Sequence, residues 1–298
     1  MAINEATSWI DSVRTCARSY LELKPKPYQL FCRTWSPAVP PRAIMLIVHG
    51  GFEHSGRYQR MAEHFVGLGY TVWAYDMVGH GKTPGMRGHI ESWEDYRADL
   101  RIMVESIAKT HVGVPLFVFG HSLGGLVLLN FAITDDARSH VRGIMASNAG
   151  LALVRVPPMI RVFSKIFAQI PRYGRRISKS IGIKSSTMSR DPEVVRAYVA
   201  DPLVHDIATP GLGQEFRRIR ADTVARAGEL SVPVLIAYGM NDQVSPCAGS
   251  QKFFDDLPSD LDKQLHVYPD AYHELHNDLD DTRIQFYKDL HAWMSARI

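Results

Sequence analysis

The pentapeptide Gly-His-Ser-Leu-Gly at 120–124 places Ser122 between two glycines. A short apolar run at 115–119 precedes it and a long apolar stretch at 126–133 follows it, which predicts a strand, a sharp turn and a helix. Such a turn is strained, so it needs glycines where side chains would collide. The turn would lift the serine hydroxyl clear of the sheet, beside the free N–H groups of the helix N-terminus. This arrangement favours attack on an ester or amide carbonyl.

A serine nucleophile needs a general base, and the base needs an acid that orients it. In a parallel sheet, reactive groups lie at the carboxyl ends of the strands. Asp242 follows the apolar run 234–238, and His273 follows the run 265–268. The chain order Ser122, Asp242, His273 is that of α/β-hydrolases. We predict that Ser122 attacks the carbonyl, His273 takes its proton and Asp242 holds the imidazole.

Other residues are alternatives for the acid and the base. Asp270 is close in sequence to His273, and Asp201 and Asp206 lie in an inserted segment described below; His276 is the alternative base. The stretch His273-Glu-Leu-His276 also resembles a metal-binding pair, but it lacks the zinc-protease arrangement. We therefore expect neither a metal nor a cofactor.

The oxyanion formed during attack needs two preorganised N–H donors. We predict that the N–H of Leu123, directly after the nucleophile, is one of them. The other is expected to be the N–H of Gly51, because the small residues that follow the apolar run 43–48 let the backbone approach. His49 in the same loop is expected to form structural hydrogen bonds.

The elements that must position these residues alternate along the chain. Apolar runs of strand length lie at 43–48, 70–75, 116–119, 143–146, 234–238 and 265–268. They lack strict alternation, as strands buried on both faces do. Helical patterns lie at about 58–68, 93–110, 123–133, 246–256 and 281–297. This order predicts an α/β fold with a mostly parallel sheet and helices on both faces, preceded by an antiparallel hairpin at 19–35.

The alternation of strands and helices stops between about 150 and 228, where prolines are frequent and the patterning is helical. We predict a helical cap at 150–228, inserted into a hydrolase core made of 1–149 and 229–298. Within the cap, apolar residues at 156–170 have the spacing of one helix face, which predicts an amphipathic helix.

Residues 151–190 hold nine Lys or Arg and no Asp or Glu, although the whole chain carries a net charge of only +3. We favour a lid helix that covers the acyl site; reversible contact between this basic segment and a membrane surface is the second hypothesis. No nucleic-acid partner is expected, because the segment lacks interleaved aromatic residues beyond Tyr173.

The 298-residue chain is 46% hydrophobic and 22% charged, which is typical of a globular protein. No stretch approaches the roughly 18–20 apolar residues of a transmembrane helix, and the first residues lack a secretory pattern. Cys16, Cys32 and Cys247 are scattered and odd in number, which favours reduced thiols. We therefore expect a cytoplasmic protein, with peripheral membrane contact as the hypothesis given above.

The stretch His-Gly-Gly-Phe-Glu-His-Ser-Gly-Arg-Tyr at 49–58 closely resembles the HG-x-x-EHSGRY loop of the monoacylglycerol lipases. Further matches to these lipases follow in the same order at 76–81, 120–124, 189–191, 201–203 and 271–276. The resemblance covers about residues 20–297. The wider group contains lysophospholipase-like enzymes and related serine esterases, and the stretch 85–96 looks more like these relatives.

The resemblance implies the same triad and the same oxyanion donors. It also implies a polar pocket for the glycerol head of the substrate, formed by Glu53, Arg57, His121 and Tyr198. A selective site must pair the two free hydroxyls of glycerol. Alternatively, an Arg57–Glu53 salt bridge pins the loop and Tyr198 belongs to the cap core. Phe52 stands where the family usually has glycine, and Leu123 where methionine is common.

We therefore expect a serine hydrolase that cleaves monoacylglycerol, or a related lipid ester, to fatty acid and glycerol through an acyl-Ser122 intermediate. A lysophospholipase, a broad carboxylesterase and an acyltransferase are the alternative enzymes. A non-catalytic lipid-binding protein on the same fold is an alternative of another class.

Overall fold

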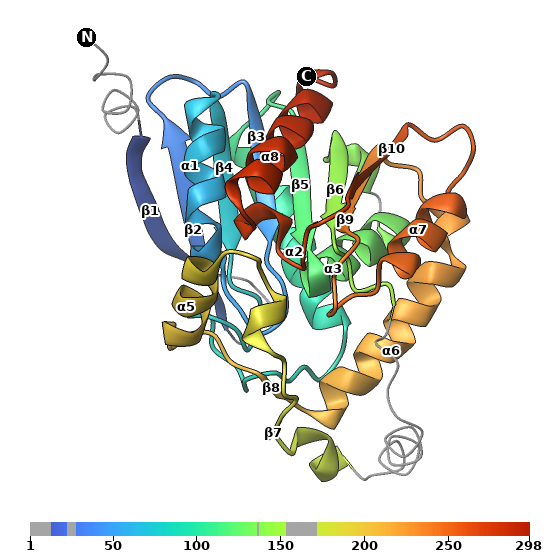
Figure 1. The fold of residues 1–298 in the computed structure, drawn as a ribbon. Helices are drawn as coiled ribbons and strands as arrows, with labels where there is room; N and C mark the ends of the chain where they lie inside the picture. The colour runs from blue at the N-terminus through green and yellow to red at the C-terminus, as the bar shows by residue number, and fades with distance from the viewer. Residues whose placement is uncertain (1–12, 23–27, 136, 153–171) are drawn as a thin grey trace.

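The computed structural model describes residues 13–22, 28–135, 137–152 and 172–298. Eight strands form one sheet in the order β1-β2-β4-β3-β5-β6-β9-β10 (Figure 1). The strands are β1 Val13–Glu22, β2 Gln29–Pro37, β3 Ala43–Val48, β4 Tyr70–Tyr75, β5 Leu116–His121, β6 Gly143–Ser147, β9 Val234–Gly239 and β10 Lys263–Tyr268. β2 pairs antiparallel with β1 and β4, and the other pairs are parallel.

Helices cover both faces of the sheet. The α-helices of the described residues are α1 Gln59–Gly67, α2 Glu94–Thr110, α3 Ser122–Thr134, α5 Pro192–Ala200, α6 Pro210–Ala225, α7 Cys247–Asp255 and α8 Asp280–Ser295. α1 and α8 pack on one face, where Phe119 meets Phe286. α2 and α3 pack on the other face, where Val118 and Leu128 are fully buried. The predicted α/β fold and the leading antiparallel hairpin are confirmed.

The burial of the strands follows their place in the sheet. Every residue of the central strands β3, β5, β6 and β9 is buried, as their unbroken apolar runs predict. β10 is an edge strand, and Tyr268 is the one buried residue of its six. The expectation that all six runs are buried on both faces is therefore wrong for β10, because an edge strand has a neighbour on one side only.

The segment between β6 and β9 supplies a group of elements at one end of the sheet, at the bottom of Figure 1. They are η3 Arg172–Arg176, β7 Lys179–Ser180, η4 Ser185–Thr187, α5, β8 Ile207–Ala208 and α6. β7 and β8 pair antiparallel, a feature that the predicted helical cap did not include. The predicted helix at 156–170 lies outside the described residues, and the domain boundaries stay a prediction.

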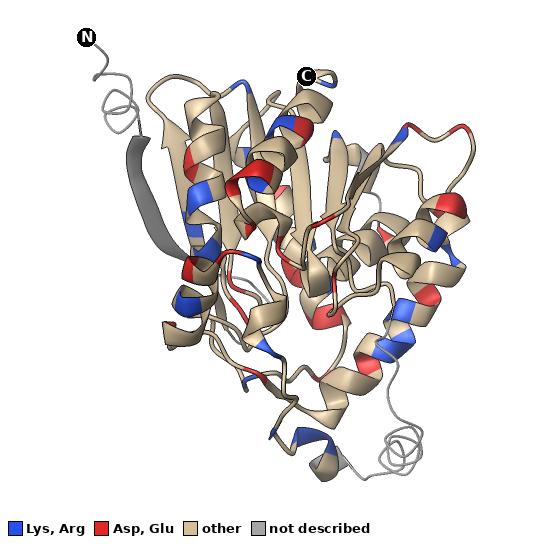
Figure 2. Cartoon of the chain, in the orientation of Figure 1, with Lys and Arg blue, Asp and Glu red and all other residues tan. Residues whose placement is uncertain are grey.

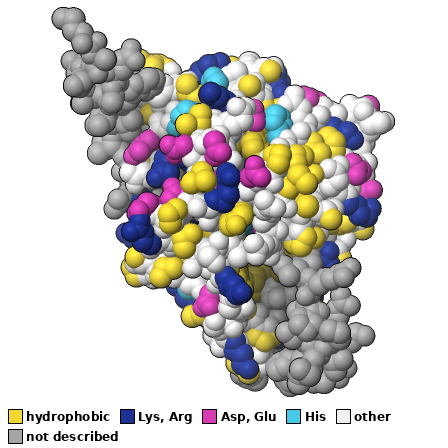
Figure 3. Space-filling view, in the orientation of Figure 1, with side chains coloured by type: hydrophobic (Ala, Val, Ile, Leu, Met, Phe, Trp, Pro, Cys, Tyr) yellow, Lys and Arg dark blue, Asp and Glu magenta, His cyan; other side chains and the backbone are white. Residues whose placement is uncertain are grey.

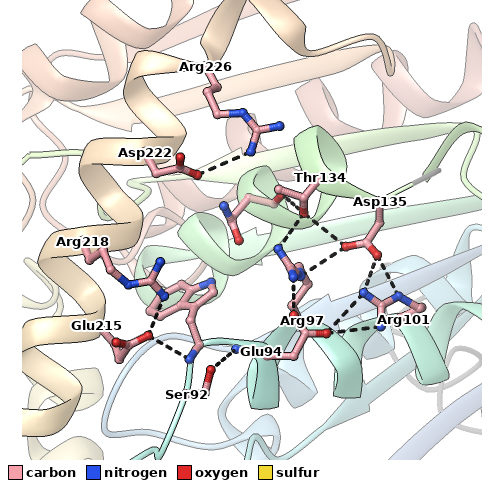
Figure 4. A network of polar contacts seen from close by, with 12 residues as sticks. Ser92, Glu94, Arg97, Arg101, Thr134, Asp135, Glu215, Arg218, Asp222 and Arg226 are labelled. Atoms are coloured by element: carbon pink, nitrogen blue, oxygen red, sulfur yellow. Dashed lines mark hydrogen bonds and ion pairs between the residues drawn. The ribbon is translucent and has the colours of Figure 1, made fainter.

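Polar contacts join α6 to α2 and α3, the helices that pack on one face of the sheet (Figure 4). The main-chain N–H of Trp93 donates to Glu215 Oε2 at 3.1 Å, and Asn130 Nδ2 donates to Thr223 Oγ1 at 3.2 Å. Beside them, Arg101 of α2 pairs with Asp135 at the end of α3. Within the described residues, no helix is both long and apolar enough to span a bilayer.

Candidate active site

The turn that carries Ser122 joins the end of β5 to the start of α3. Ser122 has a φ of 52°, in the left-handed region, which is a strained conformation for a serine. A Cβ on Gly120 would lie 2.6 Å from the Gly124 carbonyl oxygen, and a Cβ on Gly124 would lie 2.3 Å from the carbonyl oxygens of Val48 and His49. Both contacts are too short for any side chain. The two glycines therefore let the turn form, for the reason expected from the sequence.

Ser122, His273 and Asp242 form a continuous hydrogen-bonded chain. His273 Nε2 lies 2.9 Å from Ser122 Oγ, and His273 Nδ1 lies 2.8 Å from Asp242 Oδ2. Asp242 comes from the loop after β9 and His273 from the loop after β10, so adjacent strands of the sheet bring them together. The geometry is that of a nucleophile, a base and an orienting acid.

The alternatives for the acid and the base lie elsewhere. Asp270 is exposed, Asp201 bonds to His54 at 2.8 Å, and Asp206 bonds to Ser180. Both ring nitrogens of His276 are buried without a hydrogen-bond partner in the described part of the chain. Over the same residues, no group of three His, Cys, Asp or Glu side chains could hold a metal ion.

Asp242 accepts hydrogen bonds on both carboxylate oxygens. Oδ2 accepts from Asn148 Nδ2 at 2.6 Å as well as from His273, and Oδ1 accepts from the N–H groups of Val244 at 2.7 Å and Ser245 at 3.0 Å. Burial raises the pKa of Asp242, but the charge of His273 and these hydrogen bonds outweigh it and lower the pKa. The carboxylate is therefore held ionised.

Asn148 was not predicted from the sequence. It follows β6, the strand between β5 and β9, and has a φ of 46°. Its place directly after a buried strand, at the end of the sheet where Ser122 and Asp242 also lie, is the sequence signal that points to this position, but it does not give the side chain's partner.

His273 is 3% exposed and packs against His121 at a ring distance of 4.7 Å. Burial lowers the pKa of His273, but the charge and hydrogen bond of Asp242 raise it more, so the net pKa lies above the ordinary value of 6.5. An imidazole with a raised pKa accepts the serine proton readily, and Asp242 stabilises the cation that results.

The predicted oxyanion donors lie beside Ser122. Gly51 and Leu123 line the same cavity as Ser122, and a Cβ on Gly51 would lie 3.4 Å from Leu123 Cβ. His49 bonds to the Gly50 carbonyl oxygen at 2.7 Å, and its Nε2 accepts from Met77 N–H at 2.9 Å. His49 therefore shapes the loop, as expected. The donor roles of Gly51 and Leu123 stay a prediction.

Arg57 lies between two buried carboxylates. Its guanidinium bonds to Glu53 Oε2 at 2.5 Å and to both oxygens of Glu274 at 2.6 and 2.7 Å. The ring of Tyr198 covers the guanidinium at 4.6 Å, a favourable cation–π distance. Glu53 also accepts from the N–H of Gly50 at 2.6 Å and from a neighbouring tyrosine hydroxyl. The structure thus brings together Glu53, Arg57 and Tyr198, and contains the salt bridge of the alternative interpretation as well.

Glu274 is a member of this cluster that the sequence analysis missed. Burial raises the pKa of Glu274, but the charge and hydrogen bonds of Arg57 lower it well below its ordinary range. Two carboxylates around one guanidinium leave a net charge of −1. His121 lies beside this cluster, and burial with the nearby His273 lowers the pKa of His121 to about 3, so its ring is neutral at pH 7.

A cavity of about 740 Å³ opens above Ser122. Glu53, Arg57, His121, Tyr198 and Glu274 are among its polar lining residues. Its apolar lining includes Phe52, Leu123, Ala152, Ile181, Ile183, Met188, Ala208, Leu212, Phe216 and Val244. A cavity with one polar group of residues and a larger apolar lining suits a molecule with a polar head and an acyl chain.

Comparison with known proteins gives consistent matches over most of the chain. The family described as "Serine aminopeptidase, S33" matches residues 39–280. A monoacylglycerol lipase of Mycolicibacterium smegmatis is 31% identical over 265 residues, which are 89% of this chain and 92% of that protein. The monoglyceride lipase of Homo sapiens is 32% identical over 273 residues, which are 90% of this chain and 87% of that protein.

The solved structures give the same result. The monoacylglycerol lipase of Paleococcus ferrophilus superposes with a TM-score of 0.79 at 32% identity, covering 90% of this chain and 99% of that one. The resemblance seen in the sequence motifs is confirmed. The chain therefore belongs to the serine aminopeptidase S33 family of α/β-hydrolases and is a relative of the monoacylglycerol lipases.

Proposed function

We propose that the protein hydrolyses monoacylglycerols to fatty acid and glycerol, with Ser122 as the nucleophile. The observation that carries the proposal is the hydrogen-bonded chain Ser122–His273–Asp242 at the wall of a cavity that is polar in one part and apolar in the rest. The monoacylglycerol and monoglyceride lipases to which the chain is similar support the same substrate class.

The reaction proceeds in two halves. His273 Nε2 takes the proton of Ser122 Oγ as the oxygen attacks the ester carbonyl, and the N–H groups of Gly51 and Leu123 hold the oxyanion. The ester C–O bond then breaks, and His273 returns the proton to the departing glycerol oxygen. Water, deprotonated by His273, attacks the acyl-Ser122 ester; the bond between the acyl carbon and Ser122 Oγ breaks, His273 returns the proton to Oγ, and the fatty acid leaves.

The charge of the polar cluster favours an uncharged head group. The guanidinium of Arg57 is paired with both Glu53 and Glu274, so this cluster is net negative, and the lysine that lines the cavity, Lys184, is an exposed residue outside the cluster. A lysophospholipid would bring its phosphodiester charge next to these carboxylates, whereas glycerol hydroxyls donate hydrogen bonds to carboxylate oxygens. The arrangement therefore supports monoacylglycerol over lysophospholipid.

The experiment is a fluorophosphonate labelling assay followed by kinetics on 1- and 2-monoacylglycerols, lysophosphatidylcholine and a butyl ester. Ser122→Ala should abolish labelling and hydrolysis, while Ser92→Ala, at an exposed serine, should leave both intact. Labelling that persists in Ser122→Ala would refute the assignment of the nucleophile. A higher kcat/KM for lysophosphatidylcholine would refute the assignment of the head group.

Tyr198 tests the head pocket. Tyr198→Phe keeps the ring over Arg57 but removes the hydroxyl. The activation barrier for monoacylglycerols should rise by about 1 kcal/mol, a typical hydrogen-bond contribution, so kcat/KM should fall for these substrates. The kcat/KM for the butyl ester should stay unchanged. Equal losses on both substrates would assign Tyr198 a packing role.

Reversible membrane contact through the cap is the second part of the proposal. Ile177 and Ile181 are 51% and 48% exposed, and Lys179 and Lys184 are exposed beside them. Figure 2 draws basic residues and no acidic ones on the η3–β7 stretch, and Figure 3 has basic and apolar side chains together at the lower tip. Exposed apolar residues that are surrounded by basic residues favour binding to an anionic lipid surface.

Vesicle co-sedimentation tests this contact. Charge reversal at Lys179 and Lys184 should reduce binding to phosphatidylcholine vesicles that contain phosphatidylserine. Lys109→Glu is the control. Lys109 lies near the end of α2, just before β5 begins, and so at the end of the parallel strands opposite the cap. Binding that is indifferent to phosphatidylserine and to the cap lysines would refute the contact.

A further inference from the structure

Phe52 has a backbone conformation that a phenylalanine seldom adopts. Its φ is 69°, in the left-handed region where a Cβ is crowded and glycine is favoured. A bulky residue keeps such a conformation only where its surroundings over-determine it, and such residues cluster at functional sites. The proposed reaction assigns Phe52 no role.

Contacts on both sides hold Phe52 in this conformation. Its carbonyl oxygen accepts a hydrogen bond from the N–H of His205, in the cap segment, at 2.9 Å. Its ring lies edge-on to the His205 ring at 5.6 Å and tilted against the His80 ring at 6.3 Å. The next residue, Glu53, is tied to the N–H of Gly50. The loop and the cap therefore fix the ring in place.

The half-buried Phe52 belongs to the lining of the cavity. It lines the cavity together with Ser122 and Leu123, and it packs with the same apolar cluster as Leu123 and Leu212. It directly follows Gly51, so the Cα atoms of the two residues are about 3.8 Å apart. Phe52 is therefore a fixed residue of the cavity lining that directly follows the predicted oxyanion donor.

We propose that Phe52 is a specificity-determining residue that selects acyl chains unbranched at the carbon next to the carbonyl. A branch at that carbon would stand close to the carbonyl held between Gly51 and Leu123, where it would meet the ring that the cap holds in place. The inference rests on the proposed ester hydrolysis at Ser122 and adds the acyl class that the site accepts.

The test compares p-nitrophenyl hexanoate with p-nitrophenyl 2-methylhexanoate. The shared leaving group keeps the glycerol pocket out of the comparison. Phe52→Gly should raise the ratio of kcat/KM for the branched over the unbranched ester at least about tenfold, the usual discrimination for one methyl group in a pocket. Phe52→Leu should raise it less, by about threefold. Phe216→Ala is the matched control, because it removes a ring from the cavity wall beside Gly150.

An unchanged ratio in the Phe52 variants, or an equal rise in Phe216→Ala, would overturn the proposal. If a thermal melt shows that Phe52→Gly does not fold, Phe52→Leu decides by the same comparison. Absence of hydrolysis of the unbranched ester by the unmodified protein would refute the proposed function instead, so the two failures are distinguishable.

Discussion

Asp242→Asn separates the orientation of His273 from the stability of the fold. The Asp242 carboxylate is the acceptor in all four of its hydrogen bonds. The donors are the Asn148 amide, the His273 ring, and the N–H groups of Val244 and Ser245. An asparagine must turn its own NH₂ toward one of these pairs. Turned toward Val244 and Ser245, it would leave two main-chain donors without an acceptor, at about 1–3 kcal/mol each.

The other orientation costs less stability but prevents catalysis. With the NH₂ toward His273, the Asn148 amide flips and the imidazole moves its proton to Nε2, so these three side chains stay paired with one another. The proton on Nε2 then faces Ser122 Oγ, and the ring cannot accept the serine proton. We expect kcat/KM to fall about 10⁴-fold, the loss known for the same change in another Ser-His-Asp enzyme, which corresponds to about 5.4 kcal/mol of barrier.

The assay combines kcat/KM on an uncharged ester with urea unfolding of the same variant. The free energy of unfolding should fall by only about 1–2 kcal/mol, since one charge-assisted set of hydrogen bonds becomes neutral. Asn148→Ala is the matched variant: it removes one hydrogen bond from Asp242 and leaves the His273 contact, so activity should fall only about tenfold. An Asp242→Asn enzyme with activity close to that of the unmodified protein would refute the orienting role.

Three further predictions follow from the buried groups. The pKa of His273 is raised above 6.5 mainly because the charge and hydrogen bond of Asp242 outweigh burial. As the pH is lowered, kcat/KM should therefore fall, with the midpoint of the fall above pH 6.5. A pH–rate profile with a lower midpoint would contradict this. Gly124→Ala should lower the free energy of unfolding by about 3 kcal/mol or more, because its Cβ would meet two main-chain oxygens at 2.3 Å, whereas Gly213→Ala in α6, with open space around it, should raise it by up to about 1 kcal/mol. Burial and the nearby His121 lower the pKa of His276 to about 3. Between pH 6.5 and pH 3, His276 is therefore protonated in the unfolded chain and neutral in the folded chain. Stability should fall by about 2 kcal/mol per such histidine from pH 7 to 5, and urea titrations should find a smaller fall in His276→Phe.

The parts of the fold that could be predicted are those in which burial imposes a pattern. β3, β4, β5, β6 and β9 are fully or almost fully buried, so apolar runs located them within two residues. β7 and β8 have two residues each, too few to show any period. Their pairing depends on how the chain returns over the cavity, which no local pattern encodes.

The same distinction holds within the site. Asp242 and His273 could be predicted because each follows a strand, and the strand ends of a parallel sheet meet at one edge. Asn148 also follows a strand, but its amide reaches Asp242 through a left-handed backbone conformation that asparagine adopts in only some contexts. Glu274 pairs with Arg57 across 217 positions of the chain. A carboxylate next to a histidine does not by itself reveal a partner so distant in sequence.

The Arg57–Glu274 pair connects the proposed head-group pocket with the predicted base. Arg57 follows Gly51 by six residues and Glu274 directly follows His273, so the ion pair joins the loop of the predicted oxyanion donor to the loop of the base. Burying three charged groups costs desolvation, and a buried ion pair is weak evidence for stability alone. The charge of Glu274 is also among the influences that raise the pKa of His273. Changes at Arg57 should therefore reduce hydrolysis of simple esters as well as monoacylglycerols, and the Tyr198 hydroxyl is the better probe of the head pocket.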